Sequence, residues 1–270
     1  MVPGSFALIG AGQVASHLAP AFVSGGIPCD AVWSRTIAHA QKLSERLAGT
    51  LPLDDLKDFV RQILSRNTEL ILISVPDNAI PEVVSALPND LCCPVVHTSG
   101  TTSMEVLGRF SLHGVLYPMQ TFSHSRDIDL TEVPFFLEFN DPKVEDLLKA
   151  LTESIGAKKV YRLPDEDRVK LHLAAVFGCN FVNHLYALSS HILESTSIPF
   201  EVLRPLLAET LDKAMSQPPE KVQTGPAVRR DTLTITRHLA LLDNTDPDLA
   251  AIYRLLTSSI QHYSKQHDHE

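Results

Sequence analysis

One stretch near the N-terminus decides the fold of this 270-residue chain: Phe6-Ala7-Leu8-Ile9-Gly10-Ala11-Gly12-Gln13-Val14-Ala15. Four apolar residues lead directly into two glycines and then into a helix, as in the Gly-x-Gly-x-x-Ala fingerprint of dinucleotide-binding domains. The first glycine permits a sharp turn, the second lets a pyrophosphate approach the backbone, and the alanine allows close packing of helix on strand. The pattern predicts a cofactor site at the start of this helix, formed by Gly10, Ala11, Gly12, Gln13 and Val14. The alternative is a tight strand–helix turn without a ligand.

The end of the second expected strand, residues 31–36, indicates which dinucleotide binds. NAD-binding proteins place Asp or Glu here, on the ribose hydroxyls, and this chain has Ser34, Arg35 and Thr36 instead. Two hydroxyls and a guanidinium suit a 2′-phosphate, so the sequence predicts NADP rather than NAD. Arg35 could instead be a solvated loop residue, or could stack on adenine without selecting a phosphate.

Composition excludes several classes of function. The chain is 44% hydrophobic, has a formal net charge of −9 and contains no run rich in Lys or Arg, which argues against nucleic-acid and anionic-membrane partners. No uninterrupted apolar run is long enough to span a bilayer, and residues 1–5 lack the basic region of a signal peptide. The four cysteines form no Cys-x-x-Cys pair, and the twelve histidines are scattered. We therefore expect a cytoplasmic protein without a metal site.

Strand and helix patterns alternate through the first 160 residues or so. This alternation predicts an α/β, doubly wound Rossmann domain over residues 1–163, whose ligands bind at the carboxyl ends of the strands. Asp54 is the expected cap of the third helix. The later expected strands cover residues 50–53, 70–75, 94–100, 114–118, 135–139 and 159–161, and the later expected helices cover 38–47, 55–64, a stretch from 79, and 144–155.

The pattern changes near Pro164, after which apolar residues follow helical spacing. Residues 164–270 are therefore predicted to form an all-α domain. Its expected helices cover residues 166–194, 201–215, 228–242 and 249–267.

Several short motifs together resemble the deazaflavin-dependent NADP oxidoreductase and pyrroline-5-carboxylate reductase superfamily. They are Gly10-Ala11-Gly12, Ser34-Arg35-Thr36, Val75-Pro76-Asp77, His97-Thr98-Ser99-Gly100 and Tyr117-Pro118-Met119. The resemblance implies that Val75, Pro76, Asp77, Ser99 and Gly100 also contact the cofactor.

The second half resembles the C-terminal domains of the 6-phosphogluconate dehydrogenase-like group. The closest resemblance is to a bacterial family that joins a Rossmann-like domain to a helical domain of unknown function. It rests on His172-Leu173-Ala174-Ala175, Asn180-Phe181 and Thr224-Gly225-Pro226-Ala227-x-Arg229-x-Asp231. Related 3-hydroxyacid dehydrogenases carry a catalytic Lys with an Asn four residues later. Here Lys170 is followed by Ala174, so Lys170 does not inherit that role.

The expected helix over residues 166–194 supplies the catalytic candidates. At about 100° per residue, His172, Asn180 and Asn183 fall on one face, together with Val176 and Cys179. His172 could donate a proton, and the two asparagines could hold a carbonyl or carboxylate. The alternative is structural: His172 would cap backbone groups and the asparagines would hold helices together.

Substrate contacts are expected where two strands end and in one loop of the helical domain. The candidates are His97, Tyr117, Met119, Gln120, Thr224 and Arg229. His97 could instead stabilise the Ser99-Gly100 turn, and Arg229 could pair with Asp231.

The leading interpretation is an NADP-dependent oxidoreductase that acts on a small carbonyl or imine substrate and forms a homodimer through its helical domain. A non-catalytic NADP-binding sensor or scaffold is the alternative, because the Lys/Asn pair is missing. A flavin- or deazaflavin-linked transhydrogenase is a third hypothesis.

Overall fold

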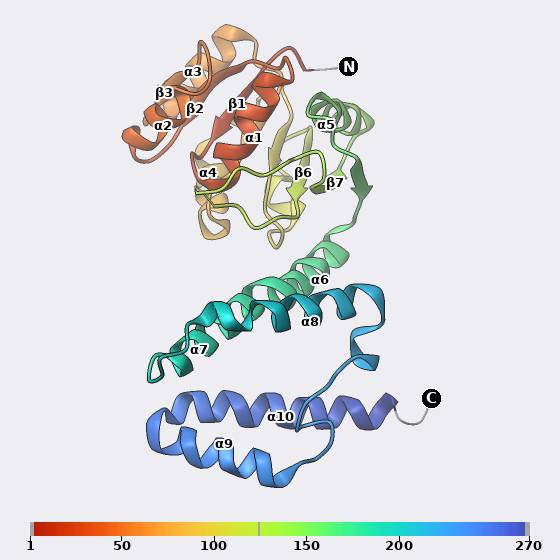
Figure 1. The fold of residues 1–270 in the computed structure, drawn as a ribbon. Coiled ribbons are helices and arrows are strands. Elements are labelled where there is room, and N and C mark those ends of the chain that lie inside the picture. The colour runs from red at the N-terminus through yellow and green to blue at the C-terminus, as the bar shows by residue number, and fades with distance from the viewer. Residues whose placement is uncertain (1–2, 124, 268–270) are drawn as a thin grey trace. The chain divides into compact units, whose positions relative to one another are not determined.

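A computed structural model describes residues 3–123 and 125–267, with side chains up to residue 264. The contacts divide the chain into two compact units, Met1–Val176 and Phe177–Glu270. The first unit is α/β and the second is helical, which confirms the predicted fold class (Figure 1).

The first unit is built on one eight-stranded sheet in the order β3-β2-β1-β4-β5-β6-β7-β8. Neighbouring strands from β3 to β6 run parallel, β7 runs antiparallel to β6, and β8 runs parallel to β7. The strands are β1 (Phe6–Ile9), β2 (Cys29–Trp33), β3 (Leu51–Leu53), β4 (Ile71–Ile73), β5 (Val95–His97), β6 (His113–Pro118), β7 (Pro134–Phe139) and β8 (Lys159–Arg162).

Helices cover both faces of this sheet. On one face, Phe6 and Leu8 of β1 belong to a core shared with α1 (Gln13–Ser24), α2 (Ile37–Ser44) and α5 (Pro142–Ser154). On the other face, Ala7 and Ile9 pack with α3 (Leu56–Arg66) and α4 (Ile80–Ala86). Because side chains alternate along a strand, a strand covered on both faces must be apolar throughout, as the sequence of β1 is. Between β1 and β4 the strand order reverses, and ligands of such sheets bind there.

Hydrogen bonds from side chains stabilise two helices of the α/β unit, α3 and α1. The cap of α3 is Asp55, one residue later than predicted, and its carboxylate accepts from the backbone N–H groups of Lys57 and Asp58. Pro20 lies inside α1 and has no N–H for the carbonyl four residues earlier, that of Ser16. Arg46 donates to that Ser16 oxygen at 3.0 Å. The guanidinium thereby replaces the hydrogen bond that the proline removes.

The expected helix over residues 166–194 is continuous but not uniform. It consists of α6 (Asp165–Ala175), a π-helical turn (Val176–Phe181) and α7 (Val182–Leu193). The contacts place α6 with the α/β unit, which ends at Val176, whereas the domain boundary near residue 163 stays a prediction. Arg168 anchors α6 there, because its fully buried side chain binds groups of the α/β unit. A composition change at Pro164 does not reveal such an anchor.

The helical unit continues with α8 (Arg204–Ser216), α9 (Thr232–Thr245) and α10 (Pro247–His267). Helix α9 starts four residues later than predicted, because Asp231 caps it through Thr234. Just before this cap, Gly225 and Arg230 have positive φ angles, +108° and +52°, which a helix does not allow. The described core of this unit is small and centres on Leu242, Leu249 and Ala250.

By length and composition alone, the helical stretch Asp165–Leu193 could cross a membrane, since an 18-residue window has a mean hydropathy of 1.2. The sequence showed no uninterrupted apolar run because Asn180, Asn183 and His184 interrupt it. A helix that packs against a partner passes the same test, so this feature is weak evidence for a membrane.

Candidate functional site

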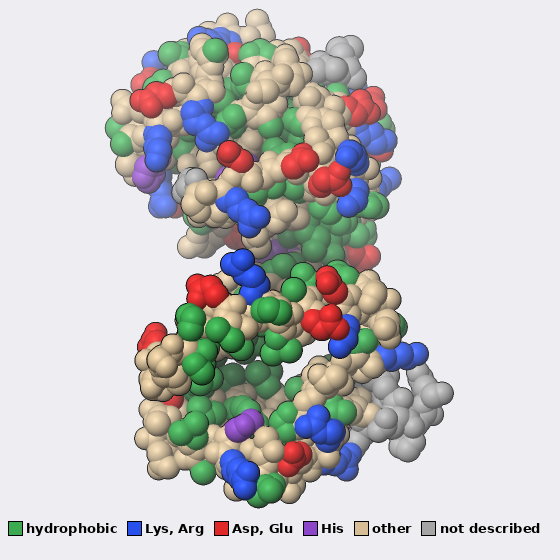
Figure 2. Space-filling view, in the orientation of Figure 1, with side chains coloured by type: hydrophobic (Ala, Val, Ile, Leu, Met, Phe, Trp, Pro, Cys, Tyr) green, Lys and Arg blue, Asp and Glu red, His purple; other side chains and the backbone are tan. Residues whose placement is uncertain are grey.

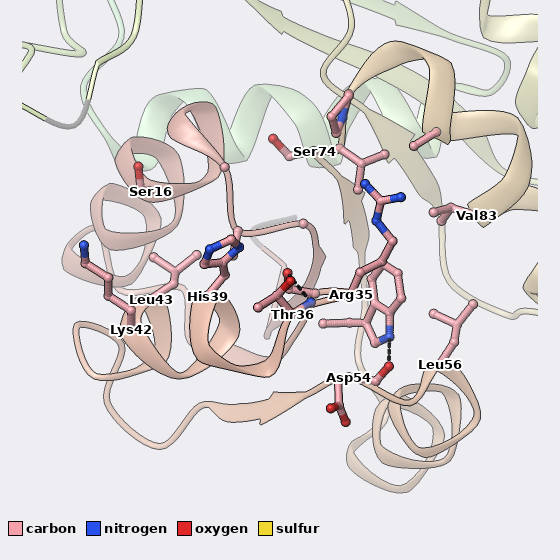
Figure 3. Close-up of a pocket in the computed structure, with 18 of the residues that line it drawn as sticks. Ser16, Arg35, Thr36, His39, Lys42, Leu43, Asp54, Leu56, Ser74 and Val83 are labelled. Carbon is pink, nitrogen blue, oxygen red and sulfur yellow. Dashed lines mark hydrogen bonds between the residues drawn. The ribbon is translucent and has the colours of Figure 1, made fainter.

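A cavity of about 740 Å³ opens at the carboxyl ends of β1, β2 and β4. It joins two motifs that are separate in the sequence, the glycine fingerprint after β1 and the Ser-Arg-Thr run after β2 (Figure 3). The predicted cofactor residues that line it are Gly10, Ala11, Gly12, Ser34, Arg35, Thr36, Val75 and Pro76.

The two fingerprint glycines have different roles here. Gly10 has φ +110°, and a Cβ atom on it would lie 2.1 Å from the backbone oxygen of Ser74. This position therefore requires glycine for the turn itself. A Cβ atom on Gly12 would meet no described atom within 4 Å. Gly12 thus leaves open space directly before the first N–H groups of α1, where a pyrophosphate would bind.

The cavity has a polar side that the sequence reasoning missed. Figure 3 shows Ser16, His39 and Lys42 on one side, and Asp54, Leu56 and Val83 on the other. His39 and Lys42 lie three residues apart on α2, so they share a helix face. That spacing after Thr36 was a usable signal in the sequence. On the other side, Trp33 donates from Nε1 to the backbone oxygen of Asp54 at 2.9 Å, which fixes its indole ring.

The remaining predicted cofactor residues do not line this cavity. Gln13 and Val14 lie in the first turn of α1. Asp77 lies just after β4, and its carboxylate accepts from the Thr101 hydroxyl at 2.5 Å. Ser99 accepts from the backbone N–H of Thr102 at 2.8 Å through its hydroxyl. The first bond links the segments that follow β4 and β5, and the second lies within the turn after β5, so polar groups line this edge of the sheet.

Tyr117 and His172 meet beside this edge. The Tyr117 hydroxyl and His172 Nδ1 share a hydrogen bond of 3.2 Å. Gly100 lies against both, because a Cβ atom on it would be 2.6 Å from His172 Nδ1 and 2.9 Å from Tyr117 Cζ. The structure thus brings together a predicted catalytic residue, a predicted substrate residue and a predicted cofactor residue.

Arg168 holds the turn that contains Gly100. Its fully buried guanidinium donates to the backbone oxygens of Ser99 at 2.8 Å and of Thr102 at 3.0 Å. It also pairs with Asp165 at 2.6 Å and with Glu138 at 3.2 Å. No sequence signal identified Arg168, since an Asp and an Arg three residues apart on a helix are typical of a surface ion pair.

His97 has no exposed surface and contacts the turn after β5, so its role at a substrate stays a prediction. Its Nδ1 accepts from the backbone N–H of Ser99 at 3.2 Å. Burial, and next the charge of Arg168, lower the pKa of His97 to about 4. The imidazole is therefore neutral at physiological pH.

The other predicted substrate residues differ in their surroundings. Met119 is half-buried at the end of β6, and exposed Gln120 accepts from the backbone N–H of Thr121. In the helical unit, Thr224 and Arg229 are exposed. Arg229 makes no ion pair with the described side chains, and the carboxylate of Asp231 is used by the α9 cap.

Asn180 and Asn183 are exposed in the helical unit, whereas His172 belongs to the α/β unit. The π-helical turn Val176–Phe181 lies between them. A π-helix turns by less than 100° per residue, so the shared face predicted from regular helical spacing does not extend across it. Within the described part of the chain, neither asparagine side chain forms a hydrogen bond.

Comparison with known proteins then gives the family. Residues 4–120 match a Rossmann-like domain, and residues 133–260 match a domain of unknown function (DUF2520). The chain belongs to the family that joins these two domains. The resemblance seen in the motifs is confirmed. The second match begins at residue 133, directly before β7 and within the α/β unit, so the family's domain of unknown function includes the end of the sheet.

Solved structures support this assignment. A candidate NADP oxidoreductase from Bacteroides fragilis is 36% identical, with a TM-score of 0.83 over 96% of this chain and 98% of that one. Imine reductase from a Pseudomonas species, 15% identical, has a TM-score of 0.63 over 98% and 93% of the two chains. 1-Pyrroline-5-carboxylate reductase from Streptococcus pyogenes, also 15% identical, has a TM-score of 0.56 over 97% and 98%. The last two share the fold alone. No curated protein matches the chain.

Proposed function

We propose that this protein is an NADP-dependent oxidoreductase that transfers hydride between the cofactor and a small carbonyl or imine compound. The observation that carries the proposal is the open space at Gly12, at the N-terminus of α1, in the same cavity as Arg35. A similar protein from Bacteroides fragilis is described as a candidate NADP oxidoreductase, and two reductases share the fold of this chain.

The preference for NADP rests on the chemistry at the end of β2. Ser34, Arg35 and Thr36 follow the strand, and all three line the cavity. A guanidinium with neighbouring hydroxyls binds a phosphate by charge-assisted hydrogen bonds, whereas a carboxylate at this place would repel it. Lys42 and His39 line the same cavity and add positive charge when protonated.

Residues outside the cofactor cavity would act on the substrate in this proposal. The cofactor, when bound, supplies or accepts the hydride, so the protein must orient the substrate and handle a proton. His172, which contacts Tyr117, would handle the proton, whereas Asn180 and Asn183 would orient a polar substrate group. Further contacts are proposed for Met119, Gln120, Thr224 and Arg229.

We further propose a cytoplasmic homodimer formed through the helical unit. Its described core is small, whereas Leu206, Met215 and Leu255 are 63%, 76% and 72% exposed. Figure 2 shows hydrophobic side chains on the visible surface of this unit. Exposed apolar surface on this scale is typical of a protein interface. A second copy of the chain could cover this apolar surface on every molecule, because it is always present at the same concentration.

The proposal is tested by two measurements on the full-length protein. Calorimetry measures NADPH binding, and NADPH absorbance measures turnover with a panel of small keto acids and cyclic imines. We expect tight binding together with turnover of at least one compound. Binding without any turnover would favour the sensor or scaffold alternative. Hydride exchange with a flavin or deazaflavin, but with no substrate, would favour the transhydrogenase.

A further inference from the structure

Tyr117 and His172 come from different elements and meet at one hydrogen bond. Tyr117 lies at the carboxyl end of β6, next to Pro118, which ends the strand, and His172 lies in the last turn of α6. The Tyr117 hydroxyl and His172 Nδ1 are 3.2 Å apart, and the ring centroids are 6.1 Å apart. The carboxyl edge of the sheet is where substrates of this fold bind. A phenol and an imidazole therefore share a proton at the edge that the proposed reaction uses.

Gly100 shows that this contact is built into the fold. Its φ angle is not positive, so its backbone conformation does not require glycine. The lack of space does require glycine, because a Cβ atom at this position would lie 2.6 Å from His172 Nδ1 and 2.9 Å from Tyr117 Cζ. Arg168 holds the neighbouring Ser99 carbonyl at 2.8 Å and thereby fixes the turn against the pair. The turn, the tyrosine and the histidine form one packed group.

The surroundings keep the tyrosine protonated. Burial raises the pKa of Tyr117, the charge of Arg168 opposes this rise, and the Asp77 carboxylate adds to it. A neutral phenol at physiological pH can donate its proton, and the nearby cationic Arg168 stabilises the phenolate that remains. His172 is half-buried, and within the described part of the chain its Nε2 has no hydrogen-bond partner. One ring nitrogen thus contacts Tyr117, and the other can exchange protons with water.

We propose that Tyr117 is the proton donor to the substrate and that His172 restores its proton. This inference rests on the proposed function and assigns the acid of that reaction. In the reductive direction, a cofactor held at the Gly12 and Arg35 cavity would supply the hydride for the carbon of the C=O or C=N group. The electron pair of that bond moves to the oxygen or nitrogen, which takes the Tyr117 proton. Tyr117 then takes the Nδ1 proton of His172 as Nε2 takes one from the solvent, and the ring returns to its Nδ1 tautomer by proton exchange with water before the next turnover.

Nitrogen NMR of the cofactor-free protein tests the arrangement without any substrate. The relay requires neutral His172 to carry its proton on Nδ1, donating to Tyr117, which leaves Nε2 free to accept. We expect this tautomer in the unmodified protein and its loss in Tyr117→Phe. Tyr161→Phe is the matched control, because Tyr161 is half-exposed on β8 and loses the same hydroxyl. A proton on Nε2 in the unmodified protein would overturn the proposal, because Nδ1 would then accept the phenolic proton.

Kinetics provide the second test once a substrate is known. A general acid contributes about a hundredfold or more, so Tyr117→Phe should lower kcat by at least that factor and leave NADPH affinity within about twofold. His172→Gln should lower kcat less, because the glutamine amide can still contact Tyr117 but cannot pass on a proton. Gly100→Ala should separate the pair and lower kcat as Tyr117→Phe does.

The results of these experiments distinguish a failure of the proton-donor role from a failure of the proposed function. Full activity of Tyr117→Phe, together with normal NADPH binding, would overturn the proton-donor role and leave the oxidoreductase proposal intact. A protein that does not bind NADPH, measured by calorimetry, would instead overturn the proposed function. With either outcome, the NMR measurement shows which nitrogen of His172 carries the proton.

Discussion

Arg168 donates from Nη1 to the backbone oxygen of Ser99 at 2.8 Å, and this bond fastens α6 to the turn after β5. The guanidinium is fully buried, and its other acceptors are the Thr102 oxygen and the carboxylates of Asp165 and Glu138. Only a planar guanidinium can serve four acceptors from different elements at once. The residue therefore ties α6 to the α/β unit.

We predict that Arg168→Ala destabilises the protein by about 3–5 kcal/mol, because it leaves buried acceptors and carboxylates without a partner. Arg168→Lys should recover only part of this loss. Urea unfolding measures the change. Lys170→Ala is the control, since the exposed Lys170 pairs with Asp167 on the surface and its loss should change stability little. Equal effects of the arginine and lysine variants would contradict this account.

His97 should make stability depend on pH. The unfolded state binds a proton on His97 near pH 6.5, whereas burial lowers the pKa in the folded state to about 4. The unfolded state therefore binds more protons in this window, and stability falls as pH drops from about 6.5 to about 4. The loss should be of the order of 3 kcal/mol, at 1.36 kcal/mol per pKa unit.

The variant His97→Asn tests the ionisation of His97 without removing its hydrogen bond to the turn. Its amide oxygen can accept from the Ser99 N–H as Nδ1 does, yet it does not titrate. The stability of His97→Asn, measured by urea unfolding, should therefore fall less than that of the unmodified protein between about pH 6.5 and pH 4. An unchanged slope would show that other groups cause it.

The sequence predicted the sheet, its fingerprint turn and the cofactor cavity, because these depend on local rules. Apolar strands and glycines at fixed spacing determine β1 and the start of α1, and Arg35 follows β2 directly. It did not predict the Arg168 anchor or the Tyr117–His172 bond, whose partners are 66 to 69 and 55 positions apart in the chain. The π-helical turn was also missed, because apolar spacing alone does not distinguish i+4 from i+5 hydrogen bonding.

Substitution of the two fingerprint glycines should give opposite results. Gly12→Val should abolish NADPH binding and leave the fold intact, since the new side chain fills the open space before α1. Gly10→Ala should destabilise the fold itself, because its Cβ atom would collide with the Ser74 oxygen. Calorimetry and thermal unfolding measure the two effects. Normal NADPH binding by Gly12→Val would show that the phosphates bind elsewhere.

The helical unit should form the dimer interface. Light scattering at micromolar concentration should give twice the chain mass of 29.7 kDa. Leu255→Asp should weaken the dimer by about tenfold or more, because an interface would bury the new carboxylate. Leu64→Asp is the control, since Leu64 is also an exposed leucine, at 55%, but lies on α3 of the α/β unit. A monomer mass for the unmodified protein would contradict the proposal.

The affinities for NADPH and NADH, measured by calorimetry on the same preparation, test the central claim most directly. We predict that NADPH binds at least about tenfold more tightly, a difference of about 1.4 kcal/mol. Arg35 lines the cavity at the end of β2 and should supply most of this gap, so Arg35→Ala should bring the two affinities close together. Equal affinities in the unmodified protein, or a gap that survives Arg35→Ala, would contradict the account.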